Sequence, residues 1–256
     1  MIKLHAPTQH NAALPDLVLL HGWCMSSRIW DQLLPRLRDC CNPWCVDLPN
    51  HGDSPAGPWP PQPSLIVDAI AATVPADAVW LGWSVAGLLI LEAAATCDLR
   101  GLILLAANPK FVRTSHWPGM PEADFSEFRQ RFIADPETAL TGFQKLQFGQ
   151  RALSSQAQQT LQTALTHPDT ERLPGLQQAL AFLHAGDARH RLGQIDCPAL
   201  ILGGTGDRLI PAEALSQTAS MLPQSSLTLL PEVGHALMLE QPAAVSEAIC
   251  GFAHAL

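Results

Sequence analysis

The chain has 256 residues, of which 47% are hydrophobic and 15% charged, and its formal charge at neutral pH is -8. This length predicts one domain, or one domain with an insertion, and the composition is that of a globular chain rather than a disordered one. The acidic balance argues against a general nucleic-acid binder. We find no apolar run long enough to span a membrane and no apolar signal-peptide core near Met1, so we expect a cytoplasmic protein.

The seven cysteines are odd in number and irregularly spaced, which in a chain of this length predicts reduced thiols rather than a disulfide framework. Cys40, Cys41 and Cys45 lie close together in the sequence. No Cys-x-x-Cys pair or nearby histidine set accompanies them, so we expect no metal site there.

Short apolar runs alternate with helix-like segments along the chain. The runs predicted as buried strands are residues 16–20, 43–48, 78–81, 99–107, 198–202 and 227–230. The segments between these runs that are predicted as helices are residues 29–37, 64–73, 85–96, 212–221 and 243–254. This alternation predicts an α/β fold with a mostly parallel central sheet and helices on both faces.

The alternation is interrupted between about residues 108 and 197, where no convincing strand is found. Helical patterns occupy residues 124–133, 136–148, 154–165 and 174–183. An insertion of this length predicts a helical cap, or lid, over residues 109–196, with residues 1–108 and 197–256 forming the core. The cap is expected to cover the carboxyl ends of the strands, where such sheets bind ligands.

The most informative motif is Gly82-Trp83-Ser84-Val85-Ala86-Gly87, between a predicted strand and a predicted helix. A serine in such a strained turn is exposed at the end of the sheet and faces a helix N-terminus, as a nucleophile requires. Ala86 stands where the usual motif has its second glycine. The alternative is a serine that only caps a helix.

Two later residues complete a hydrolytic interpretation. Asp207 follows the predicted strand at 198–202, and His235 follows the last one. The order Ser84, Asp207, His235 is that of an α/β-hydrolase triad, in which the imidazole takes the serine proton and the carboxylate orients the imidazole. Taken singly, Asp207 could be a turn residue and His235 a loop histidine.

Backbone N–H groups of Trp23, after the first predicted strand, and of Val85, after the serine, are the candidate oxyanion hole. Trp83 is either a core residue or a pocket wall. His51 and Asp53, in the loop after the second predicted strand, resemble catalytic residues, but we interpret that loop as turn-building.

These motifs resemble the α/β-hydrolases of the pimeloyl-acyl carrier protein methyl ester esterase group. The resemblance covers nearly the whole chain. Its segments are residues 19–23, the elbow at 81–84, residues 108–111 and 117–119 at the start of the cap, and Phe143-Gln144-Lys145-Leu146-Gln147.

The resemblance implies that Ser84 attacks the methyl ester of a pimeloyl chain carried on acyl carrier protein. It implies substrate contacts at Trp23, Phe143, Leu146 and Gln147. We also expect a monomer, and neither cofactor nor metal, because the three residues and two backbone amides suffice for ester hydrolysis. Carrier docking in this group uses cap arginines, and the chain offers a thinner basic set: Arg129, Arg131, Lys145 and Arg151.

Three other functions remain open from the residues themselves. A carboxylesterase of unrelated short-chain esters would use the same machinery with a different pocket. A lyase or carbon–carbon hydrolase can use a similar triad on this fold. A ligand-binding protein without catalysis would not need all three triad residues.

Overall fold

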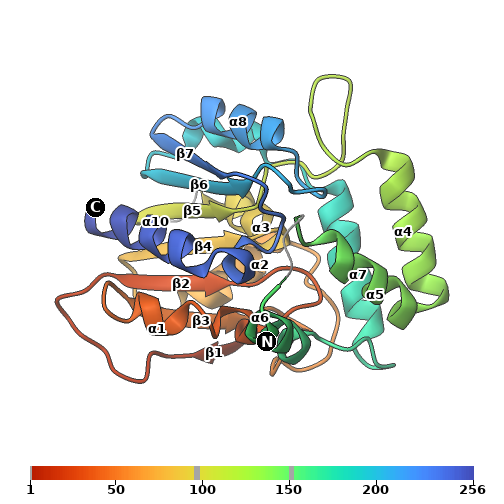
Figure 1. Ribbon diagram of the computed structural model, residues 1–256, viewed down its shortest axis with the longest axis horizontal. Helices are drawn as coiled ribbons and strands as arrows, with labels where there is room; N and C mark the ends of the chain where they lie inside the picture. The colour runs from red at the N-terminus through yellow and green to blue at the C-terminus, as the bar shows by residue number, and fades with distance from the viewer. Residues whose placement is uncertain (1, 95–98, 150–152) are drawn as a thin grey trace.

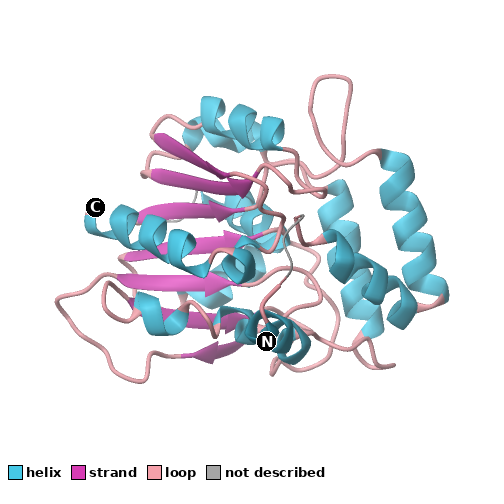
Figure 2. Ribbon diagram, in the orientation of Figure 1, coloured by secondary structure: helices cyan, strands magenta, loops and turns pink. Residues whose placement is uncertain are grey.

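The computed structural model describes residues 2–94, 99–149 and 153–256, and a seven-stranded sheet forms its centre (Figures 1 and 2). The strand order is β1-β3-β2-β4-β5-β6-β7. β1 is antiparallel to β3, and every other neighbouring pair is parallel. In chain order the strands are β1 (Lys3–His5), β2 (Asp16–Leu20), β3 (Asn42–Asp47), β4 (Ala78–Trp83), β5 (Gly101–Leu105), β6 (Ala199–Gly204) and β7 (Ser225–Leu230).

Helices cover both faces of the sheet, as the alternating pattern predicts. Because successive strand residues point to opposite faces, Val18 and Leu20 pack into one apolar layer while Leu17 and Leu19 pack into the other. The helices of the first layer are α2 (Pro63–Ala71), α3 (Val85–Ala94) and α8 (Ala212–Met221). Those of the second layer are α1 (Leu34–Leu37) and α10 (Pro242–His254). The central strands are therefore buried on both sides, which explains their continuous apolar sequences.

The fold differs from the sequence-based prediction mainly in its shortest elements. Residues 29–37 do not form one helix but a 3₁₀ turn, η1 (Ser27–Trp30), followed by the short α1. Pro35 explains the break, because a proline is tolerated in the first turn of a helix but not in its interior. Strand β1 and two short helical segments, η2 (Arg189–Gln194) and α9 (Leu237–Glu240), were not predicted, since such lengths carry no hydrophobic period.

In the described residues between β5 and β6, four α-helices precede η2: α4 (Glu122–Ala134), α5 (Pro136–Leu146), α6 (Ser155–Ala164) and α7 (Leu173–Ala185). Three of them, α4, α5 and α7, lie together beyond the carboxyl ends of the strands, whereas α6 packs beside η1 (Figure 1). The four predicted helical patterns in this region thus correspond to four helices. None of the helices in the described part of the chain is long and apolar enough to cross a bilayer.

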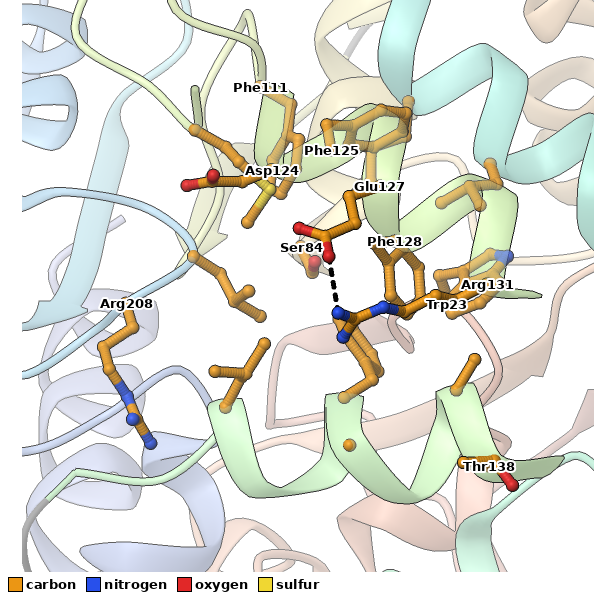
Figure 3. Close-up of a pocket in the computed structure, with 18 of the residues that line it drawn as sticks. Trp23, Ser84, Phe111, Asp124, Phe125, Glu127, Phe128, Arg131, Thr138 and Arg208 are labelled. Carbon is orange, nitrogen blue, oxygen red and sulfur yellow. Dashed lines mark hydrogen bonds and ion pairs between the residues drawn. The ribbon is translucent and has the colours of Figure 1, made fainter. Parts of the chain in front are cut away.

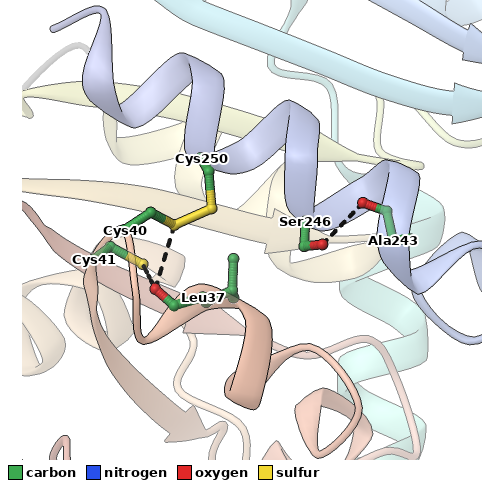
Figure 4. Close-up of a disulfide and its surroundings, with 6 residues drawn as sticks. All are labelled: Leu37, Cys40, Cys41, Ala243, Ser246 and Cys250. Atoms are coloured by element: carbon green, nitrogen blue, oxygen red, sulfur yellow. Dashed lines mark hydrogen bonds between the residues drawn. A yellow bond between two sulfur atoms is a disulfide. The ribbon is translucent and has the colours of Figure 1, made fainter.

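The prediction of reduced thiols is wrong for one pair of cysteines. Cys40, after α1, and Cys250, in α10, form a disulfide between residues 210 positions apart, with their Cα atoms 5.6 Å from each other (Figure 4). The pairing arises because α1 and α10 pack on the same face of the sheet. Spacing along the chain carries no signal of such a tertiary contact. Within the described residues, Cys24, Cys41 and Cys45 are buried free thiols.

Candidate active site

Ser84 occupies a sharp turn between β4 and α3, as the strand–serine–helix pattern predicts. Its φ angle is +59°, in the left-handed region that a serine rarely adopts. The turn is held by hydrogen bonds from the Ser84 amide to the Leu105 carbonyl (3.1 Å) and from the Gly87 amide to the Ser84 carbonyl (3.0 Å). Strained backbone of this kind, costing about 1–3 kcal/mol, is concentrated at functional sites. The turn places the half-buried Ser84 directly after the carboxyl end of the central strand β4.

The close approach of β4 and α3 depends on Gly82 and Gly87 rather than on the residue at position 86. A Cβ atom on Gly82 would lie 2.6 Å from the Gly87 nitrogen, and one on Gly87 would lie 2.2 Å from the Ala107 Cβ. Ala86 is fully buried among the core residues, so its methyl group is accommodated. The departure from the usual motif therefore leaves the geometry of the turn intact.

Asp207 and His235 lie together at the ends of neighbouring strands. His235 Nδ1 donates to Asp207 Oδ2 at 2.8 Å, and both side chains are almost fully buried. The second carboxylate oxygen of Asp207 accepts from the amides of Leu209 (2.8 Å) and Ile210 (3.0 Å), which fixes its orientation. Because a carboxylate can only accept, the proton of a neutral His235 is on Nδ1, and Nε2 is left able to take a proton.

Trp83 has a role that sequence reasoning left undecided between core and pocket wall. Its ring is buried, and its Nε1–H donates to the backbone carbonyl of His235 at 3.0 Å. The Trp83 ring also packs beside the His235 imidazole, with ring centres 5.6 Å apart. The residue before Ser84 therefore supports the loop that carries His235.

The loop after β2 runs beside Ser84. A Cβ atom on Gly22 would lie 3.3 Å from the Ser84 Cβ, so a larger residue there would crowd the turn. The indole of the next residue, Trp23, donates to the Leu176 carbonyl of α7 at 2.9 Å. Val85 is the first residue of α3, and the amide of a first helical residue has no acceptor in its own helix.

A pocket of about 720 Å³ contains Ser84 in its wall (Figure 3). Most of the wall is apolar and comes from the helices between β5 and β6. The large apolar residues of the wall are Trp23, Phe111, Met120, Phe125, Phe128, Phe143, Leu146, Leu180, Leu183 and Leu209. Such a volume and lining are typical of sites for small organic ligands.

Charged side chains stand at the side of the pocket formed by α4. Glu127 and Arg131, one helical turn apart, form an ion pair of 2.5 Å, and both are well exposed. Arg208, across the opening from Arg131 in Figure 3, donates to the Lys145 carbonyl at 2.8 Å. The pocket is therefore apolar within and charged at its rim.

The predicted substrate contacts fall into two groups. Trp23, Phe143 and Leu146 line the pocket, and the rings of Trp23 and Phe143 meet edge to face with centres 5.4 Å apart. Gln147 is buried, is not part of the pocket wall, and its amide group finds no partner in the described part of the chain. The Gln147 backbone carbonyl accepts a hydrogen bond of 2.9 Å from the Ala236 amide. Gln147 therefore supports the loop that carries His235.

The loop after β3 builds structure, as interpreted from the sequence. The Asp47 carboxylate accepts from the amides of Ser27 (2.6 Å) and Asp53 (2.9 Å) and contacts His5 Nε2 (3.1 Å). His51 is buried and donates through Nδ1 to the Pro49 carbonyl. Burial, with a further effect of the neighbouring His21, lowers the pKa of His51 to about 3.

A comparison with known protein families matches residues 17–248 to the alpha/beta hydrolase family. This match spans most of the chain and agrees with the sheet order, the turn at Ser84 and the Asp207–His235 pair. The chain therefore belongs to the alpha/beta hydrolase family.

Individual proteins similar to this chain are also known. The chain is 37% identical, over 93% of its length and 94% of the relative's, to a pimeloyl-[acyl-carrier protein] methyl ester esterase of Xanthomonas oryzae pv. oryzae. It is 35% identical, over 94% of both chains, to the protein of that name in Stenotrophomonas maltophilia. Among solved structures, an esterase of Exiguobacterium antarcticum superposes with a TM-score of 0.85 at 21% identity, covering 99% of this chain and 94% of that one. The last likeness shows the fold alone.

Proposed function

We propose that this protein is a serine carboxylesterase that hydrolyses the methyl ester of pimeloyl-acyl carrier protein, releasing methanol, in biotin synthesis. The observation that carries the proposal is the similarity, over almost the full chain, to relatives named for that activity. The Ser84 pocket and the Asp207–His235 hydrogen bond supply the chemistry that the activity needs.

In the proposed reaction, Ser84 Oγ attacks the ester carbonyl while His235 Nε2 takes the serine proton. Asp207 holds the imidazole by its Nδ1–H and stabilises the cation that forms. The backbone N–H groups of Trp23 and Val85 stabilise the oxyanion. Collapse of the tetrahedral intermediate breaks the bond to the methoxy group, which leaves as methanol with the proton from His235.

Water then resolves the acyl-enzyme. His235 takes a proton from the water, whose oxygen attacks the acyl carbonyl, and returns that proton to Ser84 Oγ when the bond to serine breaks. The product is the carboxylic acid of the carried acyl chain. These steps balance with ester and water as the sole reactants, so the proposal invokes no cofactor.

The apolar wall suits the methylene chain of the acyl group, with Trp23, Phe143 and Leu146 as its contacts. A contact to Gln147 remains a prediction of the resemblance and needs a rearrangement, because Gln147 is outside the pocket wall. The carrier protein is the proposed partner. Arg131 at the rim is paired with Glu127, so Arg208 is the proposed rim contact to an acidic carrier. Residues 109–196 are the proposed cap over the pocket. The protein is further predicted to be cytoplasmic and monomeric.

The test compares hydrolysis of methyl pimeloyl-acyl carrier protein with that of p-nitrophenyl acetate and butyrate. Wild-type protein should prefer the carrier-bound ester, and Ser84→Ala should lose at least about a thousandfold in kcat/KM on every ester. The matched control is Ser216→Ala, at an exposed serine of α8, which should retain wild-type activity. Activity on small esters alone would contradict the proposed substrate while keeping the mechanism.

Covalent labelling separates catalysis from mere binding. A fluorophosphonate should label wild-type protein at Ser84 and leave Ser84→Ala unlabelled, since only an activated serine reacts. No labelling and no ester hydrolysis by folded wild-type protein would overturn the proposal and favour a lyase or a ligand-binding protein.

A further inference from the structure

Gly142 lies in the interior of α5 and in the wall of the pocket that holds Ser84. Ala139 and Leu146, three positions before it and four after it, also line the pocket. Residues at this spacing share one face of a helix, so a side chain at position 142 would point to the pocket side. α5 thus presents a stripe to the pocket in which one position has no side chain.

The usual reasons for a glycine do not apply at this position. A Cβ atom built on Gly142 meets nothing within 4 Å, so no neighbour requires its absence, and its φ angle is not in the left-handed region. This contrasts with Gly82 and Gly87 at the Ser84 turn, where a Cβ would collide with backbone or with Ala107. A glycine inside a helix is also destabilising relative to alanine. Gly142 therefore costs stability without a packing or backbone reason.

The exposure of Gly142 and its place in the pocket wall indicate a role for the missing side chain. Gly142 is exposed whereas Ser84 is half-buried, and both line the same pocket, so Gly142 belongs to its more solvent-exposed part. The next residue, Phe143, also lines the pocket and packs against Phe128 of α4 with ring centres 5.3 Å apart. A ligand that reaches Ser84 and extends to solvent along α5 passes Gly142.

We propose that Gly142 is a specificity-determining residue, whose missing side chain keeps the outer part of the pocket open for extended acyl esters. The inference rests on the proposed function, since it takes Ser84 as the reacting group. It adds that selection for long substrates is made at this position of α5. Short esters, which end close to Ser84, do not reach Gly142.

The test uses four proteins: wild type, Gly142→Phe, Gly142→Ala and the control Gly251→Phe. Gly251 is the matched control because it lies inside α10, a Cβ there also meets nothing within 4 Å, and it is not in the pocket wall. The substrates are p-nitrophenyl acetate, octanoate and dodecanoate, together with methyl pimeloyl-acyl carrier protein.

The Phe variant at position 142 should lower the ratio of kcat/KM on octanoate to that on acetate by about tenfold or more, since blocking a few methylene contacts has effects of this size. The control Gly251→Phe should keep the wild-type ratio. Gly142→Ala should raise the melting temperature by about 2 °C, because alanine favours the helix, and should shift the ratio in the same direction by less.

A binding measurement keeps this inference separate from the proposed function. In the Ser84→Ala background, Gly142→Phe should weaken binding of dodecanoate by about tenfold, whether or not any ester is cleaved. A wild-type protein that cleaves p-nitrophenyl esters but not the carrier-bound ester would overturn the proposed substrate and leave the Gly142 comparison valid. An unchanged ester ratio and unchanged dodecanoate binding in folded Gly142→Phe would overturn the role of Gly142.

Discussion

The indole Nε1–H of Trp83 donates a hydrogen bond of 3.0 Å to the backbone carbonyl of His235. Trp83 ends β4 and directly precedes Ser84, whereas His235 lies in the loop after β7. Two segments far apart in the chain, each with a residue of the proposed triad, are therefore linked by one buried side chain.

Trp83→Phe should lower kcat by up to about tenfold, because the loss of one net hydrogen bond loosens the loop that positions His235. KM should change little, since Trp83 is not part of the pocket wall. The control is Trp30→Phe, a neighbouring core tryptophan whose Nε1 finds no partner among the described residues. Steady-state kinetics on p-nitrophenyl butyrate check this, and an equal fall in kcat for both variants would argue against a positioning role.

Gly87→Ala should destabilise the protein by about 1–3 kcal/mol, because the new methyl group would lie 2.2 Å from the Ala107 Cβ and overpack the core. Removing the opposing methyl group in the double variant Gly87→Ala/Ala107→Gly should recover part of this loss. Urea unfolding of the single and double variants measures the coupling. If the effects of the two substitutions on the free energy of unfolding were additive, the contact with Ala107 would not be the reason that position 87 requires glycine.

Gln147→Leu should raise the free energy of unfolding by about 1 kcal/mol, since it removes a buried amide that has no hydrogen-bond partner among the described residues. Gln144→Leu, at a half-buried position of α5, is the comparison. Stability is measured by urea unfolding. A loss of stability would mean that the Gln147 amide is satisfied, for instance by ordered water. The kcat/KM of the Leu variant on the carrier-bound ester separately tests the substrate contact that the resemblance implies.

Stability should fall as the pH is lowered from about 6.5. The pKa of His51 is lowered to about 3 in the folded protein, by burial and then by His21, whereas the unfolded chain binds this proton near pH 6.5. The unfolded state therefore binds more protons in this window, and His51 contributes a slope of at most about 1.4 kcal/mol per pH unit. Urea unfolding between pH 7.5 and 4.5 should show a shallower slope for His51→Asn, and identical slopes would contradict the shift.

Reduction of the Cys40–Cys250 disulfide should destabilise the protein by about 2–4 kcal/mol, because opening this crosslink frees a loop of 210 residues in the unfolded chain. Thermal melting with and without dithiothreitol measures the effect. The double variant Cys40→Ser/Cys250→Ser should melt at the same temperature in both conditions. Thiol titration of denatured wild-type protein should count two fewer thiols before reduction than after it, and equal counts would show that the bond does not form.

The strand–serine–helix turn and the order of the three proposed catalytic residues could be predicted because they depend on local sequence. Gly82-Trp83-Ser84 follows a strand of buried apolar residues, and Asp207 and His235 each follow a later strand. In a parallel sheet the carboxyl ends of the strands lie at one edge, so residues after the strands are brought together by topology. The sheet, its two helical layers and the helices between β5 and β6 follow in the same way from hydrophobic periodicity.

The tertiary structure alone decided the contacts between segments that are far apart in the sequence, because no local sequence pattern predicts them. The Cys40–Cys250 bond exists because α1 and α10 pack on one face of the sheet, a pairing absent from their spacing. The bond from Trp83 to His235 and the exclusion of Gln147 from the pocket wall depend on how separate loops meet. The reason is physical: periodicity reports which face of an element is buried, whereas the partner that it meets across the core is set by packing of the whole chain.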